Sequence, residues 1–184
     1  TAVRLAIAGN IIDFGASNQL KNGAITTAIR ESLHCDLDCG TLTALREEIA
    51  AAETILYLCD NTGEIVFDRV LIEELPLERV TAVVRGAPVI NDATMADAED
   101  VGLTDLVRVI DNGTDAPGTV LEQCDAEFRS LFDAADVVIA KGQGNYETLS
   151  DVPRPIYHVL RVKCPVIARD VGCDVGSSQI TRRA

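Results

Sequence analysis

Apolar positions change their spacing along the chain near residue 53. Beyond that point, apolar and β-branched residues gather into short continuous runs, which lie at 54–59, 79–85, 105–110, 135–140 and 155–161. Helical spacing of apolar residues separates these runs, at about 64–75, 93–101, 118–133, 143–150 and 163–171. Apolar runs that alternate with helices are typical of parallel strands buried on both faces. The pattern predicts an α/β fold, namely a three-layer α/β/α domain with a mostly parallel sheet.

The front of the chain follows a different, helical pattern. Val3, Ala6 and Ile7 keep helical spacing, a second short helix is predicted over 24–33, and a third over about 42–51. We therefore expect a helical segment over residues 1–45 and the α/β/α domain over residues 46–184. Because the sequence begins with Thr1 rather than Met, we interpret residues 1–45 as the remainder of a longer helical N-terminal domain.

Composition narrows the class of partner. With 184 residues, 47% of them hydrophobic, the chain is long enough for one buried core. A net charge of −13 argues against a nucleic-acid partner, but it leaves room for a small phosphorylated metabolite bound at a local cation. No apolar run reaches the roughly 20 residues that span a membrane. Six cysteines without a signal-like segment favour a cytoplasmic location. The oligomeric state is not determined by these features.

Oxygen-bearing side chains follow the first two apolar runs. Asp60 and Asn61 come directly after the run 54–59, and Asp92 follows the run 79–85. Because ligands bind beyond the carboxyl ends of parallel strands, these three side chains are expected to converge. Two carboxylates and an amide oxygen suit Mg²⁺ or Mn²⁺, with Co²⁺ or Ni²⁺ as alternatives. The alternative is that each residue caps the helix that follows it.

Two further loops contribute polar groups to the same predicted edge. Asn112 and Gly113 follow the third run, and Lys141 and Gly142 follow the fourth. Each pair is also a good turn sequence, so the alternative is a purely structural turn. The chemistry that all four loops suit is hydrolysis of a phosphate ester, in which Lys141 and the Gly142 N–H group neutralise phosphate oxygens. In this hypothesis Asp60, Asp92 and Lys141 are the catalytic residues.

The order of these motifs resembles that of the metal-dependent damage-control phosphatases. The similarity runs over nearly the whole chain, and its most specific parts are the Asp-Asn-x-Gly-Glu and Asn-Asp loops. The motifs that carry it are 8–15 (Ala-Gly-Asn-Ile-Ile-Asp-Phe-Gly), 59–64 (Cys-Asp-Asn-Thr-Gly-Glu), 90–92 (Ile-Asn-Asp), 111–113 (Asp-Asn-Gly) and 141–145 (Lys-Gly-Gln-Gly-Asn).

The resemblance implies a Rossmann-like domain beside a helical domain. It also implies a divalent metal held by Asp60, Asn61 and Asp92, and a phosphatase that acts on sugar phosphates or on damaged and side-product phosphometabolites. It further implies that Asn10 and Asp13 belong to the site and that Lys141 lies near substrate phosphate. Together with the loop residues, these give the expected substrate-binding set: Asn10, Asp13, Gly63, Glu64, Asn112, Gly113, Lys141 and Gly142.

Two other classes of function stay open at this point. A non-catalytic module that binds a metal or a metabolite would use the same loops without turnover. An S-adenosylmethionine-dependent methyltransferase would share the sheet, but it usually has a glycine-rich loop after its first strand, for which Gly63 alone is poor support. The sequence does not choose between water and a carboxylate such as Asp60 or Asp92 as the nucleophile.

Overall fold

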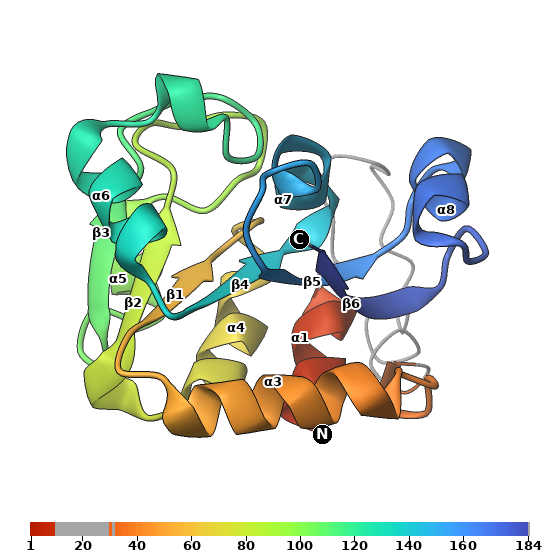
Figure 1. The fold of residues 1–184 in the computed structure, drawn as a ribbon. Helices are drawn as coiled ribbons and strands as arrows, with labels where there is room; N and C mark the ends of the chain where they lie inside the picture. Colours follow the sequence, from red (N-terminus) through yellow and green to blue (C-terminus); the bar gives the residue numbers. More distant parts are fainter. Residues whose placement is uncertain (10–29, 31, 184) are drawn as a thin grey trace.

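The computed structural model describes residues 1–9, 30 and 32–183, which fold around a six-stranded sheet (Figure 1). The strand order is β3-β2-β1-β4-β5-β6. The first five strands pair in parallel, and β6 pairs with β5 in the antiparallel direction. The strands are β1 (Ile55–Leu58), β2 (Val80–Val84), β3 (Arg108–Asp111), β4 (Val137–Lys141), β5 (Ile156–Arg161) and β6 (Ser178–Arg183).

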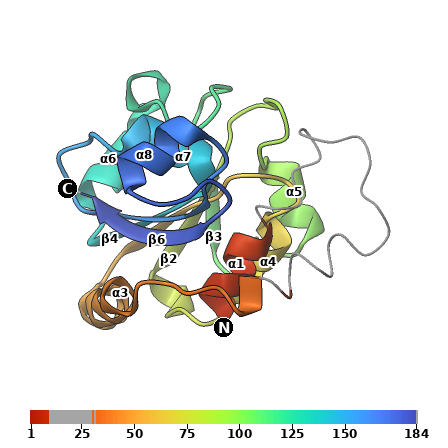
Figure 2. The same ribbon diagram turned by 90° about the vertical axis from the view of Figure 1, so that its right-hand side faces the viewer.

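Helices cover both faces of this sheet, which confirms the predicted three-layer fold. Figure 2 shows α1, α3 and α4 on one side of the sheet and α6, α7 and α8 on the other. Ala98 places α5 in the same core cluster as α1 and α4. The helices are α1 (Ala2–Gly9), α3 (Cys39–Ala51), α4 (Ile65–Ile72), α5 (Met95–Asp100), α6 (Ala126–Ala134), α7 (Gly142–Leu149) and α8 (Pro165–Val171).

Alternation along the central strands divides the core into two layers. On β1, Ile55 and Tyr57 pack in the cluster with α1 and α4, whereas Leu56 and Leu58 pack in the cluster with α6. Successive side chains of a strand point to opposite faces, so every residue at the end of a strand has a fixed side of the sheet. This rule decides where the polar residues after each strand point.

All five predicted strands are present, but two parts of the prediction need correction. Strand β6 was not predicted. The helix expected over 118–133 begins only at Ala126, after a 3₁₀ turn at Leu121–Gln123, and the side chain of Asp125 caps it by accepting the Phe128 N–H. Gly118 itself is not helical, because its φ is +75°, and a Cβ there would lie 2.4 Å from the Gly144 carbonyl oxygen.

At the front of the chain, α1 and α3 agree with the helical prediction. The helix α3 starts at Cys39, because the carboxylate of Asp38 accepts the Thr41 N–H and caps it. The helix expected over 24–33 lies largely outside the described residues. The division of the chain between residues 45 and 46 stays a prediction. In the described part of the chain, no helix has the length and apolarity to cross a membrane.

Candidate functional site

The candidate site lies at the carboxyl ends of β1, β2 and β4. The order in which successive strands are added to the sheet reverses between β1 and β4, which are parallel neighbours, and such a switch point is where open α/β sheets bind ligands. Asp60 and Asn61 follow β1, Asp92 lies in the loop after β2, and Lys141 ends β4. The fold therefore brings all four residues to one edge of the sheet.

Backbone pairing brings the predicted metal ligands together. Asn61 and Asp92 form an isolated antiparallel bridge, and the Ala93 N–H donates to the Asp60 carbonyl oxygen at 2.7 Å. Paired residues in such a bridge have Cα atoms about 4.5–5.5 Å apart. The three side chains are buried, with exposed fractions of 5%, 5% and 9% for Asp60, Asn61 and Asp92. The convergence expected from the sequence is thus present, although coordination of a metal stays a prediction.

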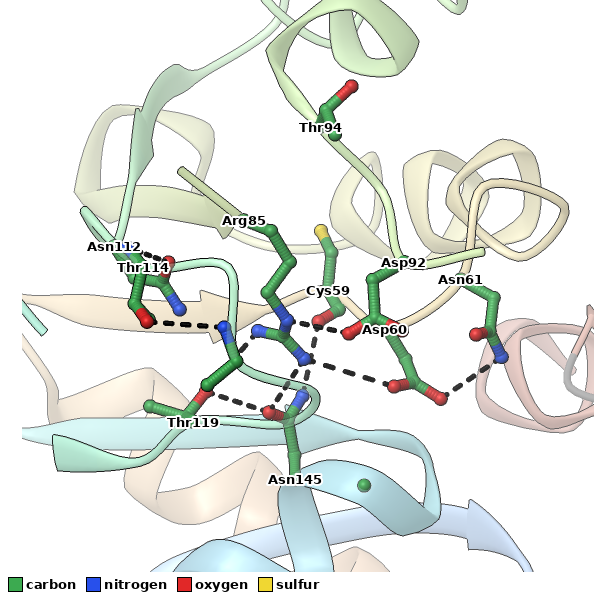
Figure 3. Close-up of polar contacts among 12 residues, drawn as sticks. Cys59, Asp60, Asn61, Arg85, Asp92, Thr94, Asn112, Thr114, Thr119 and Asn145 are labelled. Carbon is green, nitrogen blue, oxygen red and sulfur yellow. Dashed lines mark hydrogen bonds and ion pairs between the residues drawn. The ribbon is translucent and has the colours of Figure 1, made fainter. Parts of the chain in front are cut away.

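Arg85 occupies the centre of this group (Figure 3) and was not identified from the sequence. Its Nε donates to Asp92 Oδ2 at 2.7 Å, and a terminal nitrogen lies 4.0 Å from Asp60 Oδ1. The other terminal contacts are to Asn145 Oδ1 at 3.2 Å and Thr119 Oγ at 3.4 Å. Arg85 therefore orients one carboxylate directly and lies close to the second.

A second group of buried charges lies on the opposite face of the sheet. Lys141 follows Val137 and Ile139 in the alternation along β4, so its side chain points toward α1 and α4. Its Nζ donates to Asp68 Oδ1 at 2.7 Å, Glu64 Oε2 at 3.0 Å and the Ala6 carbonyl oxygen at 2.9 Å. A lysine ammonium has three N–H donors, and these three acceptors match that number. The predicted contact of Lys141 with phosphate stays untested.

Asn61 connects the two groups of charges. Its Nδ2 donates to Asp60 Oδ2 at 3.1 Å and to Glu64 Oε1 at 2.8 Å. Because a carboxamide donates only through nitrogen, these two acceptors fix which end of the Asn61 side chain carries the oxygen. Neither of these two hydrogen bonds involves the amide oxygen.

Negative charge exceeds positive charge in the buried interior of the described chain. Its buried carboxylates are Asp60, Glu64, Asp68 and Asp92, whereas its buried permanent cations are Arg85 and Lys141 alone. Burial, followed by the charges of Glu64 and Asp92, raises the pKa of Asp60 well above its usual value. Burial also raises the pKa of Glu64 and Asp68, against the opposing effect of Lys141. With all four carboxylates ionised, Asp60 and Asp92 exceed Arg85 by one negative charge, and Glu64 and Asp68 exceed Lys141 by one.

The chemistry of the donors fits a divalent cation. Two carboxylates and an amide are hard oxygen ligands of the kind that Mg²⁺ and Mn²⁺ prefer. Among the described residues there is no group of three His, Cys, Asp or Glu side chains suited to a metal; the predicted set has only two carboxylates and takes its third donor from Asn61. A cavity of about 830 Å³ opens at the opposite edge of the sheet, beside Glu53 and Val107. Asp60, Asn61 and Asp92 do not line this cavity.

Gly142 lies directly against the Asp60 carboxylate and leaves no room for a side chain. Its φ is +76°, and a Cβ built there would lie 1.7 Å from Asp60 Oδ2. The helix α7 begins at this residue, so its first N–H groups, which have no partner within the helix, lie beside the candidate ligands. The glycine allows the Asp60 carboxylate to approach the start of α7.

The remaining predicted residues have separate positions. Asn112 is buried, and its Oδ1 accepts the N–H groups of Gly86 and Thr114, which supports a structural turn with Gly113 at φ +76°. Gly63 belongs to the loop before α4. Asn10 and Asp13 lie outside the described residues. Substrate contacts of all these residues stay predictions.

Lys163 is an exposed cation at the same edge that sequence reasoning did not select. It follows β5, and its backbone N–H donates to Gln143 Oε1 at 2.8 Å, which joins it to the first turn of α7. Its charge lowers the pKa of Asp60, although burial and the neighbouring carboxylates prevail. The available signal was its position after the fifth predicted strand.

Comparison with known proteins gives consistent matches. The model of the damage-control phosphatase ARMT1-like domain matches residues 1–178. An uncharacterized protein of Methanocaldococcus jannaschii is 41% identical over 98% of this chain, and a damage-control phosphatase of Pyrococcus horikoshii is 41% identical over 96%. The chain spans 62% of the length of each of these relatives. The crystal structure of a DUF89 family protein from P. horikoshii matches with a TM-score of 0.86 and 38% identity, over 100% of this chain and 65% of that one.

Proposed function

The chain belongs to the damage-control phosphatase ARMT1-like family, and from this premise we propose that it hydrolyses phosphate monoesters of small metabolites with the help of a divalent cation. Relatives named damage-control phosphatases support the phosphatase role. Because this chain spans 62% of their length, the activity of the whole protein is part of the proposal. The substrates proposed are sugar phosphates or side-product phosphometabolites.

The convergence of Asp60, Asn61 and Asp92 is the observation that carries the proposal. These residues would hold Mg²⁺ or Mn²⁺, with Co²⁺ or Ni²⁺ as alternatives. When bound, the cation would supply the Lewis acidity that polarises a phosphoryl oxygen. With Asp60 and Asp92 ionised, the site holds two buried carboxylates and one buried cation, Arg85, and this excess of negative charge supports a bound cation at this place.

The chain's own groups would bind and orient the phosphate. The first N–H groups of α7, at Gly142 and beyond, point from the positive end of a helix dipole. Lys163 adds an exposed positive charge joined to the same turn through Gln143. Arg85 holds the Asp92 carboxylate at 2.7 Å, which restricts the orientation of one proposed ligand. Fixed donors of this kind stabilise charge that develops during phosphoryl transfer.

A phosphate-release assay tests the proposal. The purified chain is incubated with a panel of sugar phosphates and with Mg²⁺, Mn²⁺, Co²⁺ or Ni²⁺, with and without chelator. Release that chelator abolishes is expected. Release that ignores the chelator would contradict the metal site, and no release with any pair would favour a binding module.

The variant Asp60→Ala tests the site directly. It should lose Mn²⁺ binding in calorimetry and lose turnover while keeping the circular dichroism spectrum of the folded protein. Asp105→Ala is the matched control, because Asp105 is an exposed carboxylate that precedes β3 at the opposite edge of the sheet. Wild-type Mn²⁺ affinity in Asp60→Ala would remove this residue from the site.

A further inference from the structure

Lys141 has a connection to the candidate site that runs through the protein rather than through substrate. Its ammonium is completely buried, and each of its three donors has a protein acceptor within 3.0 Å. A contact with phosphate would require one of these hydrogen bonds to break. The geometry therefore assigns this lysine a different task from the one that its glycine-rich loop indicates.

The connection passes through Glu64. One oxygen of its carboxylate, Oε2, accepts from Lys141 at 3.0 Å, and the other, Oε1, accepts from Asn61 Nδ2 at 2.8 Å. A carboxylate held at both oxygens cannot rotate without losing one partner. The Asn61 carboxamide is then fixed with its nitrogen toward Glu64 and Asp60, and its oxygen is the end that remains for a cation.

The same ammonium also attaches α1 to this loop. Ala6 lies in α1, and its carbonyl oxygen accepts a hydrogen bond from Lys141 Nζ at 2.9 Å. Nearby, a Cβ on Gly9 would lie 3.0 Å from the Glu64 Cα, so α1 packs directly on the loop.

We propose that Lys141 is a positioning residue: through Glu64 it holds the Asn61 carboxamide with its oxygen toward the metal position, and it couples this alignment to the docking of α1. The inference rests on the proposed function, because it needs a divalent ion at Asp60, Asn61 and Asp92. Hydrogen bonds to the ligands of a metal orient those ligands, and their removal weakens binding about 10–100-fold.

Calorimetric titration of MnCl₂ into the metal-free chain, with no substrate present, tests the proposal. Lys141→Met keeps a side chain of similar shape but removes the three donors. Because Lys141 acts on Asn61 through Glu64, it should weaken Mn²⁺ binding about 10-fold, the lower end of the range for groups bonded directly to a ligand. A lysine that served substrate phosphate alone would leave this affinity unchanged. An unchanged dissociation constant in Lys141→Met would overturn the proposal.

Tyr57→Phe is the matched control. The Tyr57 hydroxyl donates to Asp68 Oδ1 at 2.8 Å in the same buried cluster, so the variant removes a hydrogen bond of Asp68 and keeps the Lys141–Glu64–Asn61 connection. The variant should lower the melting temperature and keep the Mn²⁺ affinity within about twofold. If it weakens Mn²⁺ binding as much as Lys141→Met does, general loosening explains both effects and the proposal fails.

Glu64→Gln tests the same connection if Lys141→Met does not fold. Lys141 and Asn61 donate to different oxygens of Glu64, and a glutamine would place an NH₂ donor at one of these two positions. One of the two hydrogen bonds is then lost, and a loss of about 10-fold in Mn²⁺ affinity is expected. Wild-type affinity in this variant would refute the proposal. If the wild-type chain binds no Mn²⁺, the proposed function and this inference fall together; if it binds Mn²⁺ and the variants do so equally, only the inference falls.

Discussion

Replacement of Gly142 by alanine should displace the Asp60 carboxylate and weaken metal binding by more than the loss of fold stability explains. The new Cβ would lie 1.7 Å from Asp60 Oδ2 and 2.2 Å from its Cγ. A carbon–oxygen contact needs roughly 3.3 Å, so the carboxylate or the backbone must move by about 1.6 Å. Metal–ligand distances tolerate only about 0.2 Å. A loss of at least about 100-fold in Mn²⁺ affinity, or roughly 2.7 kcal/mol, is therefore expected.

Gly172→Ala provides a control with the same backbone strain. Gly172 has φ +81°, close to the +76° of Gly142, but nothing lies within 4 Å of a Cβ built on it. Each variant should lose about 1–2 kcal/mol from the left-handed conformation, which lowers the melting temperature by roughly 2–8 °C. Calorimetry with Mn²⁺ and thermal unfolding would be measured on both. Equal Mn²⁺ affinity in the two variants would refute the reasoning.

Two further predictions concern buried groups. Arg85→Met removes the ion pair of the buried Asp92 carboxylate with Arg85 Nε at 2.7 Å. The free energy of unfolding, measured in urea, should fall by about 3–5 kcal/mol, because a buried charge is left unpaired. A loss below about 1 kcal/mol would contradict this account of the buried pair. His158 is buried, with no hydrogen-bond partner for either ring nitrogen among the described residues, and burial, then Arg183, lowers its pKa to about 4. The unfolded chain therefore binds the extra proton between pH 6.5 and 4, so the protein should lose up to about 3 kcal/mol of stability over that range. His158→Phe should lack this part of the acid destabilisation in urea unfolding at each pH, and an unchanged pH profile would contradict it.

The central strands were predictable because burial on both faces makes each of them a continuous apolar run. Strand β6 was not predicted because it has no such continuous apolar run. It lies at the edge of the sheet and pairs with β5 alone, so it needs little apolar surface, and within Ser178–Arg183 only Ile180 is apolar.

The convergence at the site followed from topology, since the carboxyl ends of parallel strands share one edge. The hydrogen-bond partners of Arg85 could not be predicted from the sequence, because Thr119 and Asn145 lie 34 and 60 residues further along the chain. The direction of Lys141 was available from the alternation along β4, where Val137 and Ile139 point to the α1 side of the sheet. Its loop context concealed this, because a lysine before a glycine-rich turn is a familiar phosphate ligand.

A crystal of the chain soaked in MnCl₂, with anomalous diffraction data, tests the central claim most directly. We expect one strong anomalous peak with the carboxylates of Asp60 and Asp92 and the amide oxygen of Asn61 within about 2.5 Å. A peak bound by other residues, or no peak near these three side chains at saturating Mn²⁺, would contradict the account.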